Sequence, residues 1–486
     1  MGLAGGGCRA CGWSVLGSHP MQGRSMARVL RSGRLSLRGV VRGLQSLPVF
    51  DTKITTLDSG LRVASEARHG QTATVGVYID AGSRYETPGN NGAAHFLEHL
   101  AFKGTNRRTR VQLEEEVENM GAHLNAYTSR EQTVYFARCF EQDIGHSMDI
   151  LSDILLSSQL SSMAVEQERG VILREMQEVY RQYEEVILDL LHEAAFSTSG
   201  LGMTILGPEQ NIRSLAREQF RAYIDTHYTA PRMVIAAAGA VDHDELVQLS
   251  DKFWGHLPVE PKTNYPTNFD PATFFGSDVR WPGHDDAREA HIAVGFEGSS
   301  WTAEHAFPLM IIQCMLGTWD RLSGTGTKLP SFLAQELAGR GLCHSYNCVN
   351  ISYKDTGLFG VYIVGEPALM LQALQVTAQH IKRFSEPGLI GEDELAIAKV
   401  QLKASWMQQA TGFSQICDEI GRQLLTYGRR MTVDELFDEI DRVTLHDIHR
   451  CASEYLIHPD KPVAFAALGN IAGVPDYETC AKMFKR

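Results

Sequence analysis

The sequence predicts two homologous domains, each a β-sheet packed on one side by helices. Three observations lead to this fold class. Strand-like segments recur in the two halves, helical patterns follow these strands, and a proline-rich segment separates the halves. The length of 486 residues suits two domains of ordinary size, and a composition of 43% hydrophobic and 21% charged residues is typical of a globular protein.

Two pairs of strand-like segments echo each other across the chain. Residues 75–83 and 292–300 both read as apolar strands that end in a Gly-Ser turn. Residues 234–239, near the end of the first half, resemble residues 463–469, near the end of the second, and both are apolar segments that end in glycine. The similar interval between the echoes favours a duplicated domain, although short apolar strands also resemble each other by chance.

A cluster of prolines marks a connector between the halves. Pro258, Pro261, Pro266, Pro271 and Pro282 fall within 25 residues, and this density excludes a regular helix. The sequence therefore divides into four parts, namely a leader at 1–48, a first domain at 49–257, a linker at 258–284 and a second domain at 285–486.

Helical periodicity follows the strands in both domains. In the first domain we expect helices near 108–121, 142–157, 163–183, 185–196, 214–227 and 243–254. In the second we expect them near 303–316, 330–339, 368–384, 391–408, 413–427, 433–440 and 445–455. No run of eighteen apolar residues occurs, so we expect no transmembrane segment.

The first 48 residues differ in kind from the rest. They hold seven arginines and no lysine, aspartate or glutamate, and from residue 21 to 44 the arginines recur every three or four positions. This basic, acid-free, amphipathic pattern is typical of a mitochondrial transit peptide. An arm that binds nucleic acid is the alternative, but nothing downstream is basic.

Removal of the leader leaves a strongly acidic protein. The net charge of the full chain is −13, and loss of seven arginines takes it to −20. Such a charge suits a positively charged partner or substrate and disfavours nucleic acid.

The strongest chemical signal is the segment His95-Phe96-Leu97-Glu98-His99. Histidines four apart lie on one face of a helix, close enough to share a metal ion, and Glu98 lies at the edge of that face. The order His-x-x-Glu-His is the inverted zinc signature. A chance histidine pair is the alternative, but the apolar flanks suit a helix buried beneath a site.

A third ligand is available downstream, in residues 163–178. Glu168 and Glu175 are seven apart, so they share a helix face. Glu175 is our candidate ligand, with Glu168 in the outer shell to orient a histidine or a bound water. Spacing alone does not decide among Glu168, Glu175 and Glu178, and a solvated acidic helix is the plainer alternative.

These motifs together resemble the pitrilysin-type inverted zinc peptidases. Within that family the likeness is closest to the β subunits of mitochondrial processing peptidases. It rests on the segments at 95–105, 119–133, 168–175, 319–326 and 353–360, and it runs from about residue 50 to the C-terminus.

The resemblance implies an α+β fold of two similar domains that face each other around a cavity, each a mixed β-sheet with helices on one face. It implies one Zn²⁺ per chain held by His95, His99 and Glu175, with Glu98 as general base. The first domain is then catalytic, and the second is its non-catalytic homologue.

The resemblance also implies a substrate site. Glu185 and Asp189, four apart on the helix after Glu175, match positions that bind an arginine shortly before the cut. Asn125, Ala126 and Tyr127 match an edge strand along which the peptide lies extended. An exposed acidic helix face is the alternative for the carboxylate pair.

The family members act with partners. The resemblance implies an α subunit that carries a glycine-rich loop, basic presequence peptides as substrates, and a place in the mitochondrial matrix or on the matrix face of the inner membrane. The alternative function is a core 1 subunit of the cytochrome bc1 complex, and a single polypeptide of this type can serve both roles. The presence of all four residues of the metal site favours an active enzyme.

Overall fold

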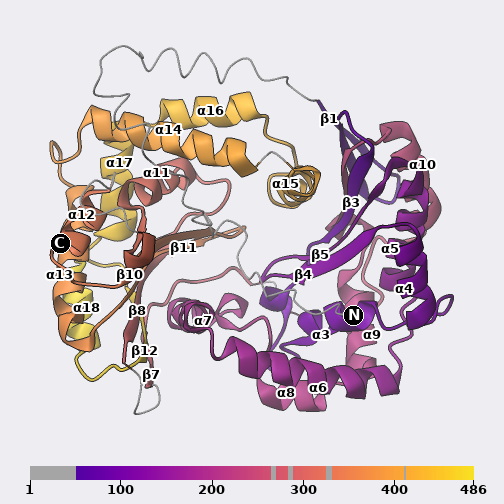
Figure 1. The fold of residues 1–486 in the computed structure, drawn as a ribbon, viewed down its shortest axis with the longest axis horizontal. Helices are drawn as coiled ribbons and strands as arrows, with labels where there is room; N and C mark the ends of the chain where they lie inside the picture. The colour runs from indigo at the N-terminus through magenta and orange to yellow at the C-terminus, as the bar shows by residue number, and fades with distance from the viewer. Residues whose placement is uncertain are drawn as a thin grey trace.

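The computed structural model describes residues 51–485 apart from 264–266, 268–269, 283–287, 324–330 and 410–411. The predicted leader at 1–48 lies outside the described residues, as does Pro266 of the predicted linker. The described chain forms two six-stranded sheets, one in each half (Figure 1).

The first sheet is mixed. Its strands lie in the order β1 (Thr52–Thr56), β2 (Arg62–Ala67), β6 (Met233–Gly239), β3 (Thr72–Ile79), β5 (Thr133–Phe140), β4 (His123–Thr128). Strands β2 and β6 are parallel, and all the other neighbours are antiparallel. Strand β4 is therefore an edge strand of this sheet.

The second sheet repeats this pattern. Its order is β7 (Asp278–Pro282), β12 (Ala464–Gly469), β8 (Ala290–Gly298), β11 (Gly357–Gly365), β10 (Ser345–Ser352), β9 (Thr318–Asp320). Only the β7–β12 pair is parallel. Strand β7 falls within the segment predicted as a linker. Pro282 does not prevent its pairing, because it stands at the end of an edge strand.

The repeated sequence segments occupy equivalent places. The first echo pair forms β3 and β8, and the second forms β6 and β12. In each sheet these two strands are antiparallel neighbours next to the single parallel pair. The predicted fold of two homologous α+β domains with mixed sheets is therefore confirmed.

Several helices of each half pack against its sheet or against one another. In the first half they are α3 (Ala93–Ala101), α4 (Arg110–Asn119), α5 (Ile144–Leu156), α6 (Ser162–Val179), α8 (Glu209–Ser214), α9 (Arg217–His227) and α10 (His243–Trp254). In the second they are α11 (Ala306–Leu316), α12 (Phe332–Gly339), α13 (Met370–Arg383), α14 (Glu392–Gln409), α16 (Val433–Arg442), α17 (Leu445–Cys451) and α18 (Tyr477–Met483). The expected helices agree closely with these, with three exceptions. Helix α6 ends at Val179, α17 ends at Cys451 and is followed by a π-helical turn at Ala452–Leu456, and the short α8 and α18 were not expected.

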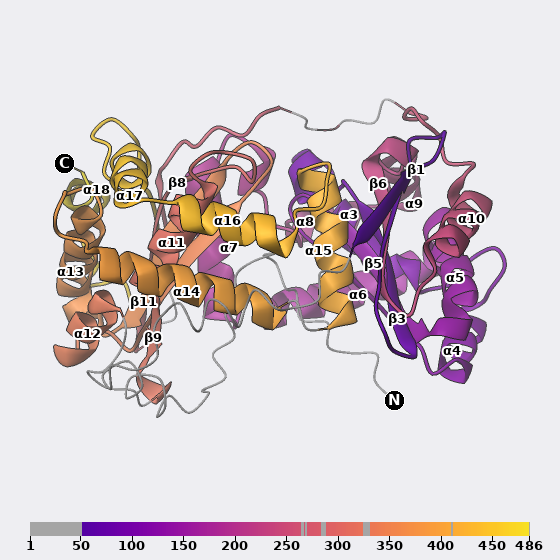
Figure 2. The same ribbon diagram turned by 90° about the horizontal axis from the view of Figure 1, so that it is seen from above.

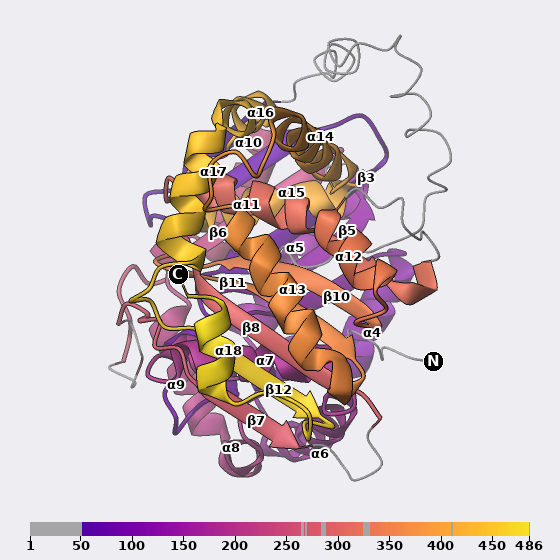
Figure 3. The ribbon, with the colours of Figure 1, turned by 90° about the vertical axis from the view of Figure 1, so that its left-hand side faces the viewer.

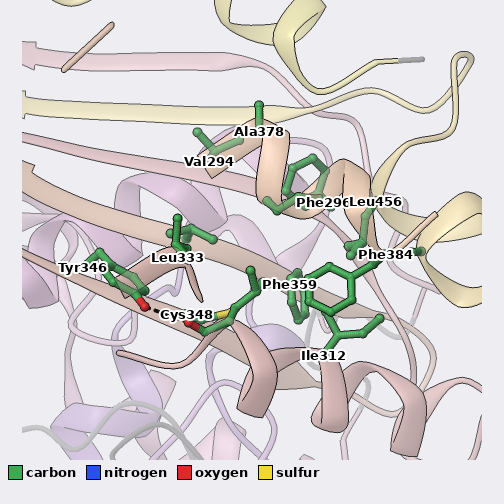
Figure 4. Packing of buried hydrophobic residues seen from close by; sticks show 14 of the residues in the cluster. Val294, Phe296, Ile312, Leu333, Tyr346, Cys348, Phe359, Ala378, Phe384 and Leu456 are labelled. Carbon is green, nitrogen blue, oxygen red and sulfur yellow. Dashed lines mark hydrogen bonds between the residues drawn. The ribbon is translucent and has the colours of Figure 1, made fainter. Parts of the chain in front are cut away.

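Apolar side chains from these helices fill a core against each sheet. Figure 3 shows α11, α13 and α18 across the face of the second sheet. That core contains Ile312 and Leu333 from the helices, Phe384 directly after α13, and Val294 and Phe359 from the strands, and all five are buried (Figure 4).

One helix from each half lies on the inner face of the opposite sheet. Helix α7 (Tyr183–Phe196), from the first half, packs on β7, β8 and β12, whereas α15 (Phe413–Thr426), from the second half, packs on β2, β3 and β6 (Figures 1 and 2). Ile187 and Leu191 of α7 and Ile416 and Ile420 of α15 are buried in these contacts. The sequence did not predict this exchange.

A pocket lies where the two halves meet. It is lined by Ser129, Arg130 and Gln132 from the first half and by Ile351, Tyr353 and Arg422 from the second. Among the described residues, no helix is both long and apolar enough to cross a bilayer.

Candidate metal centre and active site

Helix α3 carries both histidines, and its N-terminus is capped by a side chain that lies six residues before the N-cap residue in the sequence. Gly92 holds the N-cap position at a left-handed φ of 100° and has no side chain to cap the helix. The buried carboxylate of Glu86 replaces it by accepting hydrogen bonds from the backbone N–H groups of Gly92 (2.9 Å) and Ala94 (2.7 Å). Burial raises the pKa of Glu86 to about 7, and the partial positive charge of the helix terminus favours its ionised form.

The structure brings the three predicted metal ligands together. His95 and His99 project from one face of α3, and Glu175 reaches them from α6. One ligand atom from each residue lies within 4.8 Å of the others. The Oε2 atom of Glu175 is 3.1 Å from His99 Nε2 and 3.8 Å from His95 Nε2.

This arrangement fits a metal ion. The Oε2 atom of Glu175 is buried and faces two imidazole nitrogens without a hydrogen bond of good geometry. A buried carboxylate oxygen in such a place is costly unless a cation meets it. Two imidazoles and a carboxylate form the donor set of catalytic zinc sites, which keep a further position open.

The two histidines differ in their protonation. Burial and the neighbouring His99 lower the pKa of His95 to about 4, so His95 is neutral, as a ligand must be. Burial also acts to lower the pKa of His99, but the carboxylates of Glu168 and Glu175 outweigh it and raise that pKa to about 9. A metal ion must therefore displace a proton from His99.

Glu98 lies beside the ligands on the same helix. Its Oε2 atom accepts a hydrogen bond of 2.7 Å from the hydroxyl of Thr128, at the end of β4. Burial raises the pKa of Glu98, and the bond from Thr128 opposes that shift. The hydrogen bond also fixes the direction of the carboxylate.

Glu168 stands behind His99, where an outer-shell residue was predicted. Its Oε2 atom is 3.4 Å from His99 Nδ1, and its Oε1 atom accepts a 2.8 Å bond from the ammonium of Lys103. Burial acts to raise the pKa of Glu168, but His99 and Lys103 outweigh it and leave the pKa below its usual range. Glu168 is thus held as an anion that orients His99.

The predicted arginine-binding pair lies on α7. Glu185 and Asp189 are one turn apart, and both are half-buried. Asp189 already has a cationic partner in this chain, because Arg130 Nη2 lies 2.7 Å from its Oδ1 atom. Burial, Asp189 and Glu184 raise the pKa of Glu185.

The predicted peptide-binding segment is the edge strand β4. The side chain of Asn125 is exposed, and its Oδ1 atom accepts a bond from the backbone N–H of Ala126 (2.8 Å). Tyr127 points toward the other half, where its hydroxyl donates to Asp418 of α15 (2.5 Å).

Sequence reasoning missed four residues that hold this site, namely Glu86, Lys103, Thr128 and Arg130. Glu86 is six residues before the N-cap, too far for a capping-box pattern. Lys103 stands two residues after the end of α3, so helical spacing from His99 does not predict its contact with Glu168 either.

Comparison with known proteins identifies the family. The model for "Insulinase (Peptidase family M16)" matches residues 62–209, and the model for "Peptidase M16 inactive domain" matches residues 214–402. The chain belongs to peptidase family M16. The first match contains His95, Glu98, His99 and Glu175, so the candidate metal site of this M16 chain lies in the segment that matches the peptidase model.

Relatives within the M16 family share one name. The chain is 45% identical to mitochondrial-processing peptidase subunit beta of Bos taurus over 98% of its length and 96% of that protein. It is 46% identical to the subunit of the same name from Lentinula edodes, over 93% of this chain and 97% of that one. The predicted metallopeptidase activity and the resemblance to processing-peptidase β subunits are thus confirmed, and the shared name supports a mitochondrial location.

A solved structure shares the fold. A chain of "Complex III2 from Candida albicans, Inz-5 bound" superposes with a TM-score of 0.79 at 22% identity, covering 89% of this M16 chain and all of that one. At this identity the likeness shows the fold alone.

Proposed function

We propose that this chain is the catalytic β subunit of a mitochondrial processing peptidase, a zinc metalloendopeptidase that removes N-terminal presequences from imported precursors. The observation that carries the proposal is the convergence of His95, His99 and Glu175 within 4.8 Å, with Glu98 beside them on α3. The relatives' shared name supports the substrate class.

Zn²⁺ would be held by His95, His99 and Glu175, and when bound it supplies the Lewis acidity that activates water and polarises a peptide carbonyl. Glu98 takes the proton of the attacking water and returns it to the leaving amine. Its raised pKa suits both steps, and Thr128 keeps one carboxylate oxygen fixed.

Substrate binding uses the edge of the first sheet and helix α7. A peptide that lies along β4 at Asn125–Tyr127 would bond to the strand through its main chain, since β4 has one unpaired side. An arginine before the cut would lie against Glu185 and Asp189. Two carboxylates one turn apart match the two-pronged guanidinium.

The partners that we propose follow from the negative net charge of the protein without its leader and from the name that its relatives share. These are basic presequence peptides and an α subunit with a glycine-rich loop, and the place of action is the mitochondrial matrix or the matrix face of the inner membrane. The net charge of −20 without the leader supports attraction of basic leaders and disfavours nucleic acid.

The decisive experiment replaces the general base without touching the ligands. Co-purified with an α subunit, the Glu98→Gln variant should keep one zinc per chain and lose presequence cleavage by about a thousandfold or more. Metal content by mass spectrometry and single-turnover cleavage of a presequence peptide are measured together. A variant that keeps its zinc and still cuts at the parental rate would remove Glu98 from this role.

A core 1 subunit of the cytochrome bc1 complex is the second candidate, and the fold shared with the complex III chain is consistent with it. Blue-native electrophoresis of mitochondrial membranes separates the two. Recovery of the chain only in the bc1 complex, without peptidase activity, would favour the structural role.

A further inference from the structure

Arg130 joins the turn after β4 to helix α7. Its side chain is only 3% exposed. Its Nη2 atom lies 2.7 Å from Asp189 Oδ1, and its Nε atom donates to the carbonyl oxygen of Leu201 at 3.1 Å. These two contacts use different nitrogens of the planar guanidinium group, so they fix its orientation.

The carboxylate of Asp189 is bound by Arg130 but remains accessible to solvent. Its side chain is 26% exposed, so a ligand can still reach the carboxylate that Arg130 binds. Arg130 also acts on Glu185, one turn earlier, because its charge partly offsets the rise in the pKa of Glu185 caused by burial, Asp189 and Glu184. One buried cation therefore orients one carboxylate of the pair and moderates the repulsion between the two.

The segment that carries Arg130 is anchored on both sides. Two residues earlier, Thr128 donates to Glu98, the proposed base. One residue later, Glu131 accepts hydrogen bonds from the Arg84 guanidinium (2.7 Å) and from the backbone N–H of Lys354 in the second half (3.1 Å). The backbone that carries Arg130 is thus held in place by contacts on both sides.

We propose that Arg130 is a specificity-determining positioning residue: by holding Asp189, it makes the Glu185–Asp189 pair select a guanidinium over an ammonium group. The inference rests on the proposed function, in which these carboxylates bind a substrate arginine. An arginine presents two N–H groups in a plane and needs carboxylates in fixed directions, whereas a lysine is a point charge that any negative site attracts. Arg130 fixes the direction of the Asp189 carboxylate, and its positive charge offsets part of the negative charge of the Glu185–Asp189 pair.

The proposal predicts a change in selectivity rather than a general loss. Three presequence peptides that differ only at the arginine position shortly before the cut, carrying Arg, Lys or Gln, are compared by kcat/KM in the purified heterodimer. We call the kcat/KM for the Arg peptide divided by that for the Lys peptide the Arg/Lys ratio. Arg130→Gln should lower this ratio by about tenfold, which corresponds to the loss of one charge-assisted hydrogen bond. The preference for both cations over Gln should remain, because the two carboxylates remain.

Two further variants show whether Arg130 acts through Asp189. Asp189→Asn should lower the Arg/Lys ratio by itself, and the double variant with Arg130→Gln should show no further fall. Arg130→Lys keeps the charge, but a single ammonium group cannot make both the Asp189 and the Leu201 contacts in the same way. Arg130→Lys should therefore lower the Arg/Lys ratio too, and it replaces Arg130→Gln as the test if Arg130→Gln does not fold.

Arg108 offers a matched control. It is another buried arginine of the first half, and it binds Asp149, Asp153 and Glu116 rather than α7. Arg108→Gln should lower the thermal midpoint and leave the Arg/Lys ratio unchanged.

The outcomes separate this inference from the proposed function. An unchanged Arg/Lys ratio in Arg130→Gln, or an equal loss for all three peptides, overturns the role of Arg130 while Asp189→Asn still reduces the ratio. If Asp189→Asn also keeps the parental ratio, then the arginine site is not on α7, and both the substrate proposal and this inference fail.

Discussion

Several residues of the proposed site are held in place by neighbours that take no direct part in the chemistry. Glu86 caps the helix that carries both histidines, Glu168 orients His99, and Thr128 orients Glu98. Such supporting contacts matter because an error of about 1 Å in a catalytic group can cost about a hundredfold in rate.

Metal affinity should depend on pH through His99. Its pKa is about 9 without metal, so the imidazole is protonated below that pH and must lose a proton to bind zinc. The apparent affinity should then fall by about tenfold for each unit of pH between 8 and 6. Competition with a chelator of known proton affinity measures it.

Glu168→Gln is the control for this dependence. Loss of the carboxylate removes a group that raises the pKa of His99, so the variant should show a shallower slope over the same range. Equal slopes in the two proteins would mean that Glu168 does not set the protonation of His99.

At the scale of elements, the exchanged helices need close contact with the sheets. A Cβ on Gly421 of α15 would lie 2.3 Å from the ring of Tyr78 on β3, and one on Gly295 of β8 would lie 3.1 Å from Leu191 of α7. Glycine at these two positions lets a helix backbone and a sheet approach, and in doing so buries the second face of each sheet.

Gly421→Ala should therefore destabilise the protein. The added methyl group overlaps the Tyr78 ring, and overpacking of this kind costs about 1–3 kcal/mol in the free energy of unfolding. Urea denaturation measures the change. Gly339, on α12, is the matched control because a Cβ there meets nothing within 4 Å. Gly339→Ala should change stability by less than about 1 kcal/mol, and equal losses in the two variants would contradict the packing argument.

At the scale of the molecule, the two halves complete each other. Each contributes the helix that covers the inner face of the other's sheet, and ion pairs join them near the site. Arg84 of the first half binds Asp355 of the second with two hydrogen bonds, and Lys354 of the second half binds Asp80 of the first. The halves cannot separate without exposing the apolar contacts of α7 and α15.

A chain cut in the connector should stay assembled. Residues 51–263 and 270–485, expressed together, should co-purify through a tag on one fragment and bind one zinc, because the exchanged helices hold them. Residues 51–263 alone should aggregate, since the inner face of the first sheet lacks α15 and the apolar face of α7 lacks its sheet. A soluble, monomeric first fragment with full metal binding would show that the first half folds without the second.

Local patterns in the amino-acid sequence predict a candidate metal site made of a histidine pair and a downstream glutamate, and they predict the repeated order of strands and helices. Both follow from local periodicity: His95 and His99 are four apart, Glu168 and Glu175 seven apart, and the strand echoes stand at similar intervals. Only the family resemblance chose Glu175 over Glu168 and Glu178, and the structure agrees in bringing Glu175 to both imidazoles.

Three features depend on the folded arrangement, namely which sheet α7 and α15 cover, which residue caps α3, and which cation binds Asp189. Both exchanged helices are amphipathic, and an apolar helix face does not specify its partner. Arg130 and Asp189 are 59 residues apart in the chain, so their contact depends on how the turn after β4 and α7 are placed by the whole fold. Local spacing carries no information at that distance.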